Sequence, residues 1–574
     1  MKKTFKILLL IISTLSVFLS ACTVNLEKNR TVEEAAYEDR YDVIDKGPVK
    51  GGAIRLFTTP VDTLNPVTTG NLYVQDFLGL VFEGLYTLDY DQQPLPVLAK
   101  ETSVSSDGLT VTVELKENIK WHDKTPFKAE DVVFTINTLL DSKTDSVYKK
   151  NVQNIAAVSA SGNKVIISMK QPYSFIKNQL TFPIISSHIF ANAKLEEKKS
   201  KANLTPVGTG PYCFEAFDEK NGVKLKLNEE WWNAKNQPDE GQTSADTADT
   251  ANNTGSSSSA QKDNALRLPY LATIEIKVFN NSNSAYSAFQ ARDVDVLPAQ
   301  YNEYRKYIGR TDINLKRYTG RNFEFLTLNI KKGPLMDKRL RNALNYMLDK
   351  KQLVDNAATG IAVPAEIPLT PNSWVYKLVN LEEKDSVGKA KELMAQSGYS
   401  LDAKKKYVKK GSKKAIALKL IVNDGNALRF NTATELAAQL GKSGITVQVV
   451  KLPWESYRNA LKSGAYDLAL TGYKVSSVPD LSFAYSTAEI QSGLNVAGYS
   501  NPVVDGYLQQ ILTNSNTETQ KSLFINLINT VVDERPYIGL YFINDSMMYG
   551  KNIRGAVNPY VWNKYNDITR WYLP

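Results

Sequence analysis

Apolar and polar residues alternate or recur along this 574-residue chain in patterns that predict its elements. Residues 109–115 alternate between apolar and polar side chains, which predicts a half-buried strand. Residues 130–140 place apolar side chains at helical spacing, with Glu130 and Asp131 in the first turn, where the helix dipole favours acids. Residues 53–57 are expected to form the first strand, and a second long helix is expected to begin at Asp337.

The clearest order of elements lies between residues 387 and 470. It predicts a helix that ends before Gly398, followed by strand, helix, strand, helix and strand at residues 416–422, 434–440, 445–449, 457–461 and 466–470. These spacings indicate a parallel α/β sheet with crossover helices. Ligands of such sheets bind beyond the carboxyl ends of the strands, so Gly472 and Tyr473 are expected at a rim.

Two polar segments interrupt these patterns. Residues 237–265 are rich in Ser, Thr, Asp, Asn and Gly, and we expect a disordered insertion because so few apolar side chains cannot offset the entropy of ordering. The run from Lys404 to Lys414 contributes to a net charge of +9. It precedes an alternating strand, so an exposed hairpin is favoured over a nucleic-acid site.

The N-terminus predicts export. Lysines precede an apolar run of 13 residues from Ile7 to Leu19, too short to cross a bilayer and typical of a signal peptide at residues 1–21. Leu19-Ser20-Ala21-Cys22 resembles a lipobox, in which Cys22 carries lipid; an ordinary signal peptide with an incidental cysteine is the alternative. Residues 22–50 then form a flexible tether, and the protein lies at the outer face of the cytoplasmic membrane, or on the periplasmic side in a two-membrane cell.

Candidate chemistry is sparse. If Cys22 carries lipid, Cys213 has no partner, so neither a disulfide framework nor a thiolate metal site is expected. Only His122 and His188 could serve a metal or a Ser-His-Asp site, and both are expected to be structural. No glycine-rich phosphate loop is present, so the sequence predicts no cofactor and no enzyme.

A collinear series of motifs resembles the extracellular solute-binding proteins of the oligopeptide, dipeptide and nickel class, which serve ABC transporters. The series comprises Gly51-Gly52, Asp62-Thr63-Leu64-Asn65-Pro66, Val81-Phe82-Glu83-Gly84-Leu85-Tyr86, Lys120-Trp121-His122-Asp123-Lys124-Thr125-Pro126, Val207-Gly208-Thr209-Gly210-Pro211-Tyr212 and Asn501-Pro502. Lys124 stands where the family usually has glycine, so we expect that turn to form without a residue that is free to adopt a positive φ.

The resemblance implies an α/β, two-lobed fold of the periplasmic-binding-protein type, with a hinge and an additional domain. Lobe I would comprise residues 51–82, 181–325 and 541–574, the additional domain 83–180, and lobe II 326–540. A peptide would bind between the lobes of a monomer, and ABC permease subunits would recognise the closed form.

The resemblance also suggests ligand-binding residues. Trp454 and Tyr473 match the spacing of two aromatic residues that flank the cleft. The family's acidic residue for the ligand amine falls at Ser476, so Asp480 could replace it only if the loop bends differently. Other candidates are Arg429 for a ligand carboxylate, and Tyr73, Tyr148 and Tyr541 for the cleft lining; ordinary packing is the alternative for each.

Three other functions stay open. The protein could pass peptide signals to a regulatory pathway, or it could bind a non-peptide ligand such as a metal chelate or an oligosaccharide. A secreted hydrolase is the least favoured alternative.

Overall fold

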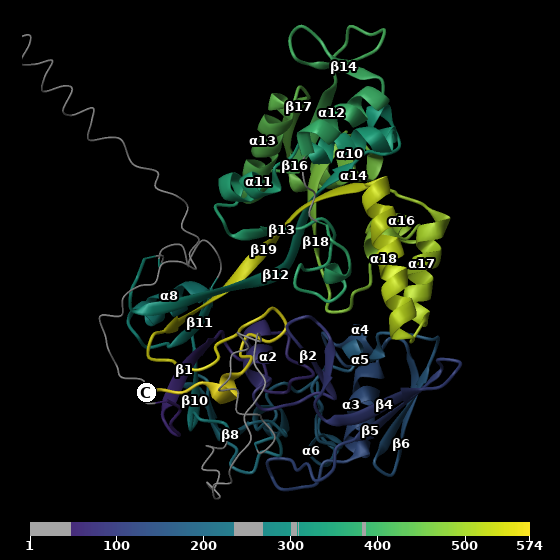
Figure 1. Cartoon of the computed structure of the whole chain (residues 1–574). Helices are drawn as coiled ribbons and strands as arrows, with labels where there is room; N and C mark the ends of the chain where they lie inside the picture. Colours follow the sequence, from purple (N-terminus) through teal and green to yellow (C-terminus); the bar gives the residue numbers. More distant parts are fainter. Residues whose placement is uncertain (1–46, 235–267, 300–306, 308, 382–385) are drawn as a thin grey trace, which may run out of the picture. The chain divides into compact units, whose positions relative to one another are not determined.

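A computed structural model describes residues 47–234, 268–299, 307, 309–381 and 386–574 (Figure 1). The expected signal peptide, Cys22, most of the tether and the insertion at 237–265 lie outside the described residues. In the ranges just given, no helix combines the length and the apolar character needed to span a membrane. All described residues belong to one compact unit, Lys46–Pro574.

The N-terminal strand belongs to a four-stranded sheet in the order β1-β10-β9-β8. β1 confirms the strand predicted at residues 53–57 and runs parallel to β10, while the other pairs are antiparallel. Ile54 and Leu56 are fully buried beneath this sheet. The strands are β1 (Ala53–Thr58), β8 (Tyr212–Asp218), β9 (Gly222–Leu227) and β10 (Thr273–Val278).

A second four-stranded sheet, antiparallel in the order β4-β5-β7-β6, follows in the chain. The alternation at residues 109–115 confirms β5, and its Val111 and Val113 join the same hydrophobic core as Ile54. Helix α3 packs on β6 and β7, and Asp131 closes its first turn by accepting from the backbone N–H of Lys128 at 3.0 Å. The elements are β4 (Ala99–Val104), β5 (Thr110–Leu115), α3 (Ala129–Leu140), β6 (Ile155–Ser161) and β7 (Lys164–Met169).

The third sheet has the order β11-β19-β12-β18-β16-β17, with β13 paired to β19. It confirms the α/β order predicted at residues 416–470, because β16 pairs in parallel with both β17 and β18. The predicted rim position of Gly472 and Tyr473 is wrong: both lie inside β18, which continues because it pairs with β12. The elements are β11 (Val296–Ala299), β13 (Ala362–Pro364), β16 (Ala417–Asn423), α13 (Ala427–Lys442), β17 (Thr446–Leu452), α14 (Trp454–Ser463) and β18 (Leu468–Lys474).

Two long strands, β12 (Ile313–Leu328) and β19 (Tyr537–Gly550), run side by side through this sheet (Figure 1). Their ladder shifts register between Thr319 and Phe323, so the bulge divides each strand into two halves. Met547 of β19 belongs to the core beneath the first sheet, whereas Phe542 belongs to a core of C-terminal helices. The bulge therefore lies where the hydrophobic cores of the protein meet.

The C-terminal helices form that other core, in which Phe524 and Leu527 are fully buried. Phe175 reaches into it from the segment after β7, and Ser174 donates its backbone N–H to the carbonyl of Leu512 at 2.7 Å. The helices are α15 (Ser482–Tyr485), α16 (Glu489–Ser492), α17 (Pro502–Thr513) and α18 (Thr517–Glu534).

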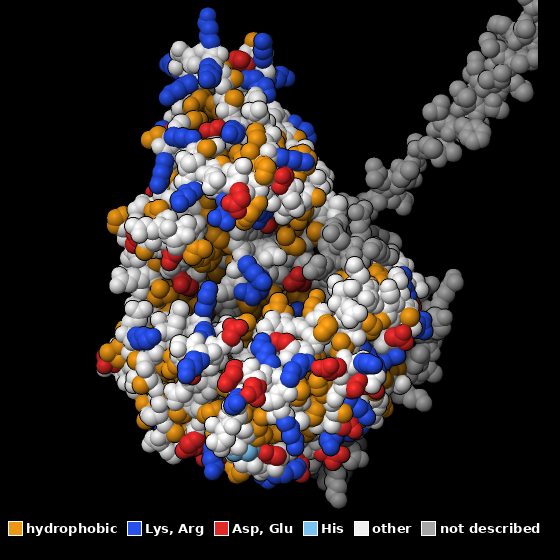
Figure 2. All heavy atoms as spheres, turned by 180° about the vertical axis from the view of Figure 1, so that it is seen from behind, with side chains coloured by type: hydrophobic (Ala, Val, Ile, Leu, Met, Phe, Trp, Pro, Cys, Tyr) orange, Lys and Arg blue, Asp and Glu red, His pale blue; other side chains and the backbone are white. Residues whose placement is uncertain are grey.

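The basic run from Lys404 to Lys414 begins in the turn of a hairpin, which confirms the predicted exposed hairpin. Strands β14 (Tyr399–Leu401) and β15 (Tyr407–Lys409) pair there, and most of the lysines are exposed. Figure 2 shows basic side chains prevailing at the end of the molecule where Figure 1 places β14.

The predicted helix at Asp337 is confirmed as α10, with the Asp337 side chain accepting from the backbone N–H of Arg339 at 2.9 Å. The turn at Lys124 forms without glycine, as expected, and Lys124 itself adopts a φ of 74°, the region that glycine prefers. The remaining elements are α2 (Leu72–Leu78), β2 (Tyr86–Leu88), β3 (Pro94–Pro96), α4 (Lys149–Val152), α5 (Ile176–Gln179), α6 (Ser187–Phe190), α7 (Lys201–Leu204), α8 (Ser282–Gln290), η2 (Gly333–Met336), α10 (Lys338–Tyr346), α11 (Lys350–Ala357), η3 (Tyr376–Leu378), α12 (Ser386–Gln396) and η4 (Ile568–Arg570).

Candidate ligand-binding site

Three charged residues come from three neighbouring strands at the bulge. Asp545 lies on β19, Arg321 on β12 and Lys474 at the end of β18. β19 approaches β12 closely at Gly320, where a side chain would not fit. A Cβ at that position would lie 2.6 Å from the Ile543 carbonyl oxygen and 3.1 Å from Asp545 Oδ2. We call Asp545, Arg321 and Lys474 the charged row.

Two contacts hold the guanidinium of Arg321 in place, but most of its N–H groups donate to no described residue. Its Nε donates to the carbonyl oxygen of Val475 at 2.8 Å, and its central carbon lies 4.5 Å from the centroid of the Trp562 ring. Burial lowers the pKa of Arg321, and the negative charge of Asp545 opposes this effect. No other hydrogen bond joins this guanidinium to a described residue, so most of its N–H groups stay available.

The carboxylate of Asp545 also has unused hydrogen-bonding capacity toward the described residues. Within the described ranges it accepts no hydrogen bond and forms no ion pair. Burial raises the pKa of Asp545, whereas the positive charges of Lys564, Lys474 and Arg321 act to lower it. The Asp545 carboxylate is therefore stabilised by the charges of several cations, although it forms no ion pair with any described one.

An acid–base pair lies beside the charged row. Lys564 donates to Asp76 of α2, and both side chains are about one fifth exposed, at 22% and 21%. Burial raises the pKa of Asp76, against the opposing charge of Lys564. Trp562, two residues before Lys564, has a buried indole N–H that finds no acceptor among the residues the structure describes.

Two predicted tyrosines flank this pair. Tyr73 packs edge-on against Phe57 at 4.7 Å between ring centroids, and Lys564 Nζ lies 5.8 Å from the Tyr73 ring centroid. Burial and the charge of Asp76 raise the pKa of Tyr148 to about 12. Tyr73 and Tyr148 thus lie near Asp76, but their role in ligand binding stays a prediction.

The other predicted residues do not gather at one place. Trp454 is 53% exposed at the start of α14 and stacks on Tyr457 at 5.9 Å. Tyr541 is fully buried, and its hydroxyl lies 2.7 Å from that of Thr432, so this side chain belongs to the core.

Arg429 is engaged by a neighbour. Its Nε and Nη2 bind the two carboxylate oxygens of Glu324 at 2.7 and 3.0 Å. A bidentate pair of this kind leaves little capacity for a ligand carboxylate. Ligand binding by Arg429 stays a prediction, and the observed pair gives the side chain a structural role.

Tyr473 and Asp480 also have internal partners. Tyr473 stacks on Phe325 at 4.5 Å, and its hydroxyl donates to the carbonyl oxygen of Leu494 at 2.6 Å. Asp480 accepts from the backbone N–H of Ser482 at 2.8 Å, at the start of α15. Neither residue lies in the charged row, and ligand binding by either stays a prediction.

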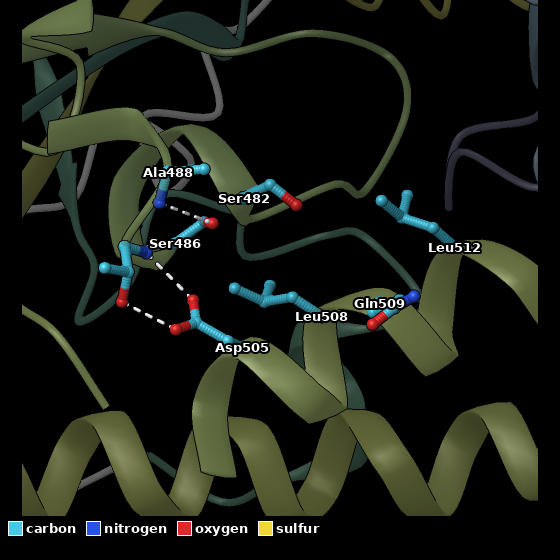
Figure 3. A pocket seen from close by; sticks show the side chains of 8 residues that line it. Ser482, Ser486, Ala488, Asp505, Leu508, Gln509 and Leu512 are labelled. Carbon is cyan, nitrogen blue, oxygen red and sulfur yellow. Dashed lines mark hydrogen bonds between the residues drawn. The ribbon is translucent and has the colours of Figure 1, made fainter. Parts of the chain in front are cut away.

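Two cavities differ in their position relative to the charged row. One of about 350 Å³ lies between α15 and α17, and its Asp505 is already bound by the backbone N–H and hydroxyl of Thr487 at 2.8 and 2.6 Å (Figure 3). The other, of about 450 Å³, is lined by Lys316, Arg317 and Tyr318, and Tyr318 pairs with Asp545 across the ladder. Only the second cavity lies beside the charged row.

The histidines have structural partners. His122 Nδ1 accepts from the backbone N–H of Gly208 at 3.2 Å, Nε2 lies 3.0 Å from the Gly210 carbonyl oxygen, and burial lowers the pKa of His122 to about 4. His188 lies 2.7 Å from Asp123. Across the described ranges, no three His, Cys, Asp or Glu side chains are grouped as metal ligands would be.

The chain is similar to known proteins over most of its length. A family model described as bacterial extracellular solute-binding proteins, family 5 Middle, matches residues 93–492. The oligopeptide-binding protein AppA of Bacillus subtilis (strain 168) is 24% identical over 583 residues, covering 100% of this chain and 99% of AppA. The glutathione-binding protein GsiB of Escherichia coli (strain K12) is 25% identical over 505 residues, covering 86% and 89%.

Solved structures agree on the fold. The ABC transporter substrate-binding protein CtaP of Listeria monocytogenes superimposes with a TM-score of 0.67 at 22% identity, covering 91% of this chain and 99% of CtaP. This likeness confirms the predicted two-lobed fold of periplasmic binding proteins.

Proposed function

We propose that this chain, which belongs to the bacterial extracellular solute-binding proteins of family 5, is the receptor of an ABC importer and that its ligand is a peptide. The family acts outside the cytoplasm, and the expected export signal agrees with that location. The names of AppA, an oligopeptide-binding protein, and GsiB, a glutathione-binding protein, support a peptide ligand.

The charged row is the observation that supports this proposal most. It lies at the bulge where β12 and β19 pass between hydrophobic cores. It holds two half-buried charges of opposite sign: Asp545 accepts no hydrogen bond from a described residue, and Arg321 donates only to the Val475 carbonyl oxygen among them. A ligand with charged groups would compensate the free energy lost in desolvating them. Contacts that form only when both lobes engage the ligand would favour a closed state.

We propose the lobes at the boundaries expected from the resemblance: residues 51–82, 181–325 and 541–574 for lobe I, 83–180 for the additional domain and 326–540 for lobe II. The merged core of the first two sheets supports the additional domain as part of lobe I. The contact of Phe175 with the C-terminal helices would also bring that domain against lobe II.

The protein acts as a receptor and not as a catalyst, in this proposal, and it needs no cofactor. Both ring nitrogens of His122 have backbone partners, at Gly208 and Gly210. This supports a receptor, because a general base needs a ring nitrogen that can accept a substrate proton. A peptide ligand recovered chemically intact is expected; a cleaved one would support the hydrolase alternative.

The receptor is further proposed to be a monomer anchored by lipid on Cys22. Changing Cys22→Ala should move it from the membrane fraction to the soluble extracytoplasmic fraction. Membrane association that persists, without a lipid mass on Cys22 of the unmodified chain, would contradict the anchor.

Native mass spectrometry of the purified protein tests the ligand class. We expect a bound peptide that dissociates intact on denaturation, and competition by a defined peptide library in calorimetry. Recovery of an oligosaccharide or a metal chelate, together with no binding from the library, would refute the peptide and leave only the receptor.

A further inference from the structure

The positions of Arg321 and Asp545 at the bulge indicate how the charged groups of a ligand would be spaced. Arg321 and Asp545 lie on neighbouring strands, and strands in a sheet are about 4.8 Å apart. Asp545 Oδ2 lies over Gly320, the residue directly before Arg321. Even so, no ion pair joins the two side chains in the described structure.

Each side chain is prepared for a partner of opposite charge. Arg321 is fixed by Val475 and by the Trp562 ring, which preserves its planar fork for a carboxylate. Asp545 lacks a donor although it is half-buried, and an ammonium offers three. Lys474 pairs across the ladder with Asn322, the residue after Arg321, and adds an exposed positive charge.

We propose that Arg321 and Asp545 form a subsite for a zwitterionic head group, in which Arg321 binds a carboxylate and Asp545 binds an ammonium. Asp545 Oδ2 lies beside Gly320, next to Arg321 in the chain, and the charges of Arg321 and Asp545 act on one another, so the two charged groups of the ligand must be close as well. A carbon atom that bears both groups meets this condition, as in a free amino acid or a residue linked through its side chain. A linear peptide bears the two groups at opposite ends.

This inference rests on the proposed function, since it specifies which peptides the receptor would prefer. Isomeric dipeptides isolate the geometry: γ-glutamyl-alanine keeps the ammonium and carboxylate of glutamate on one carbon, whereas α-glutamyl-alanine does not. N-acetyl-γ-glutamyl-alanine removes the ammonium alone. Calorimetry with these three compounds, after removal of any co-purified ligand, measures each contribution.

We expect the unmodified protein to bind γ-glutamyl-alanine at least about tenfold more tightly than either of the other compounds, as for the loss of a half-buried charge pair. Asp545→Asn should abolish the discrimination against the acetylated compound, and Arg321→Gln should abolish the preference for the γ isomer. Arg321→Lys and Asp545→Glu keep the charge and test whether geometry matters if a neutral variant fails to fold. Arg292→Gln, an exposed arginine that lines neither cavity, is the matched control and should bind as the unmodified protein does.

Three results would overturn the subsite. Equal binding of both isomers, with other peptides still bound, would refute it and leave the proposed function intact. Loss of the ammonium preference in Asp480→Asn and not in Asp545→Asn would assign the amine to Asp480. Failure to bind these compounds and every peptide of the library would refute the subsite together with the proposed function.

Discussion

The buried pair between Glu324 and Arg429 allows a sharp test of a structural role against a ligand-binding role. The two side chains are only 6% and 15% exposed, so solvent screens their interaction little. In Glu324→Gln the bidentate carboxylate is lost, and Arg429 keeps Asn423 Oδ1 at 3.3 Å as its remaining side-chain partner among the described residues. The guanidinium then stays buried with its charge uncompensated.

The expected cost is about 3–5 kcal/mol in the free energy of opening this part of the sheet, the range for removing one member of a buried ion pair. Replacing both residues, as in Glu324→Gln with Arg429→Met, removes the uncompensated charge. The double variant should therefore be more stable than Glu324→Gln alone by at least about 2 kcal/mol.

Hydrogen exchange measured by mass spectrometry, on peptides from β12 and β18 over a urea series, reports this opening free energy without assuming that the whole chain unfolds in one step. The exposed pair of Glu518 and Lys521 supplies the control, since Glu518→Gln should leave exchange unchanged. A cost below about 1 kcal/mol for Glu324→Gln would refute the structural role. If Arg429→Met weakened peptide binding while exchange stayed unchanged, Arg429 would be a ligand residue instead.

Three further outcomes are expected. Burial raises the pKa of Glu83 from 4.5 to about 7. The protonated side chain therefore contributes fully to stability below pH 4.5, and this contribution is lost as the pH rises through 7. Glu83→Gln should remove that part of the pH dependence of Tm, and an unchanged profile would contradict the raised pKa. Lys124→Gly should raise stability by about 0.5–1 kcal/mol in thermal unfolding, because φ is 74° there, and destabilisation would show that the Lys124–Glu230 pair matters more. Trp454→Ala should weaken peptide binding by at least about 1 kcal/mol in calorimetry with little change in Tm, and unchanged affinity would remove Trp454 from the site.

The sequence predicted the α/β region well because its strands are apolar and its helices are periodic over short distances. The rim position of Gly472 and Tyr473 was wrong for a non-local reason: β18 is extended by pairing with β12, which lies far earlier in the chain. The same limit applies to Arg429, whose partner Glu324 is 105 residues away in sequence. Local patterns do not specify such pairings.

The residues of the charged row were not among the predicted site residues, although the sequence contains a signal for them. Asn544-Asp545-Ser546 interrupts the apolar residues of one strand, and Gly320-Arg321 precedes the more apolar half of its neighbour. A charge inside a buried strand is costly unless it is paired, so such positions are candidates for function. What the sequence could not show is that the bulge places the two segments side by side.

The bulge has a mechanical consequence for the receptor. Between Thr319 and Phe323 the ladder from β12 to β19 is interrupted, while pairing with β18 begins at Asn322. Bending between the two halves of β12 breaks fewest backbone hydrogen bonds at this point. Arg321 lies within the interrupted stretch, so a ligand that binds its side chain also restrains residues that do not pair with β19. Ligand binding at Arg321 and the stiffness of β12 would then be coupled at the same residue, with no need for a conformational change elsewhere in the protein.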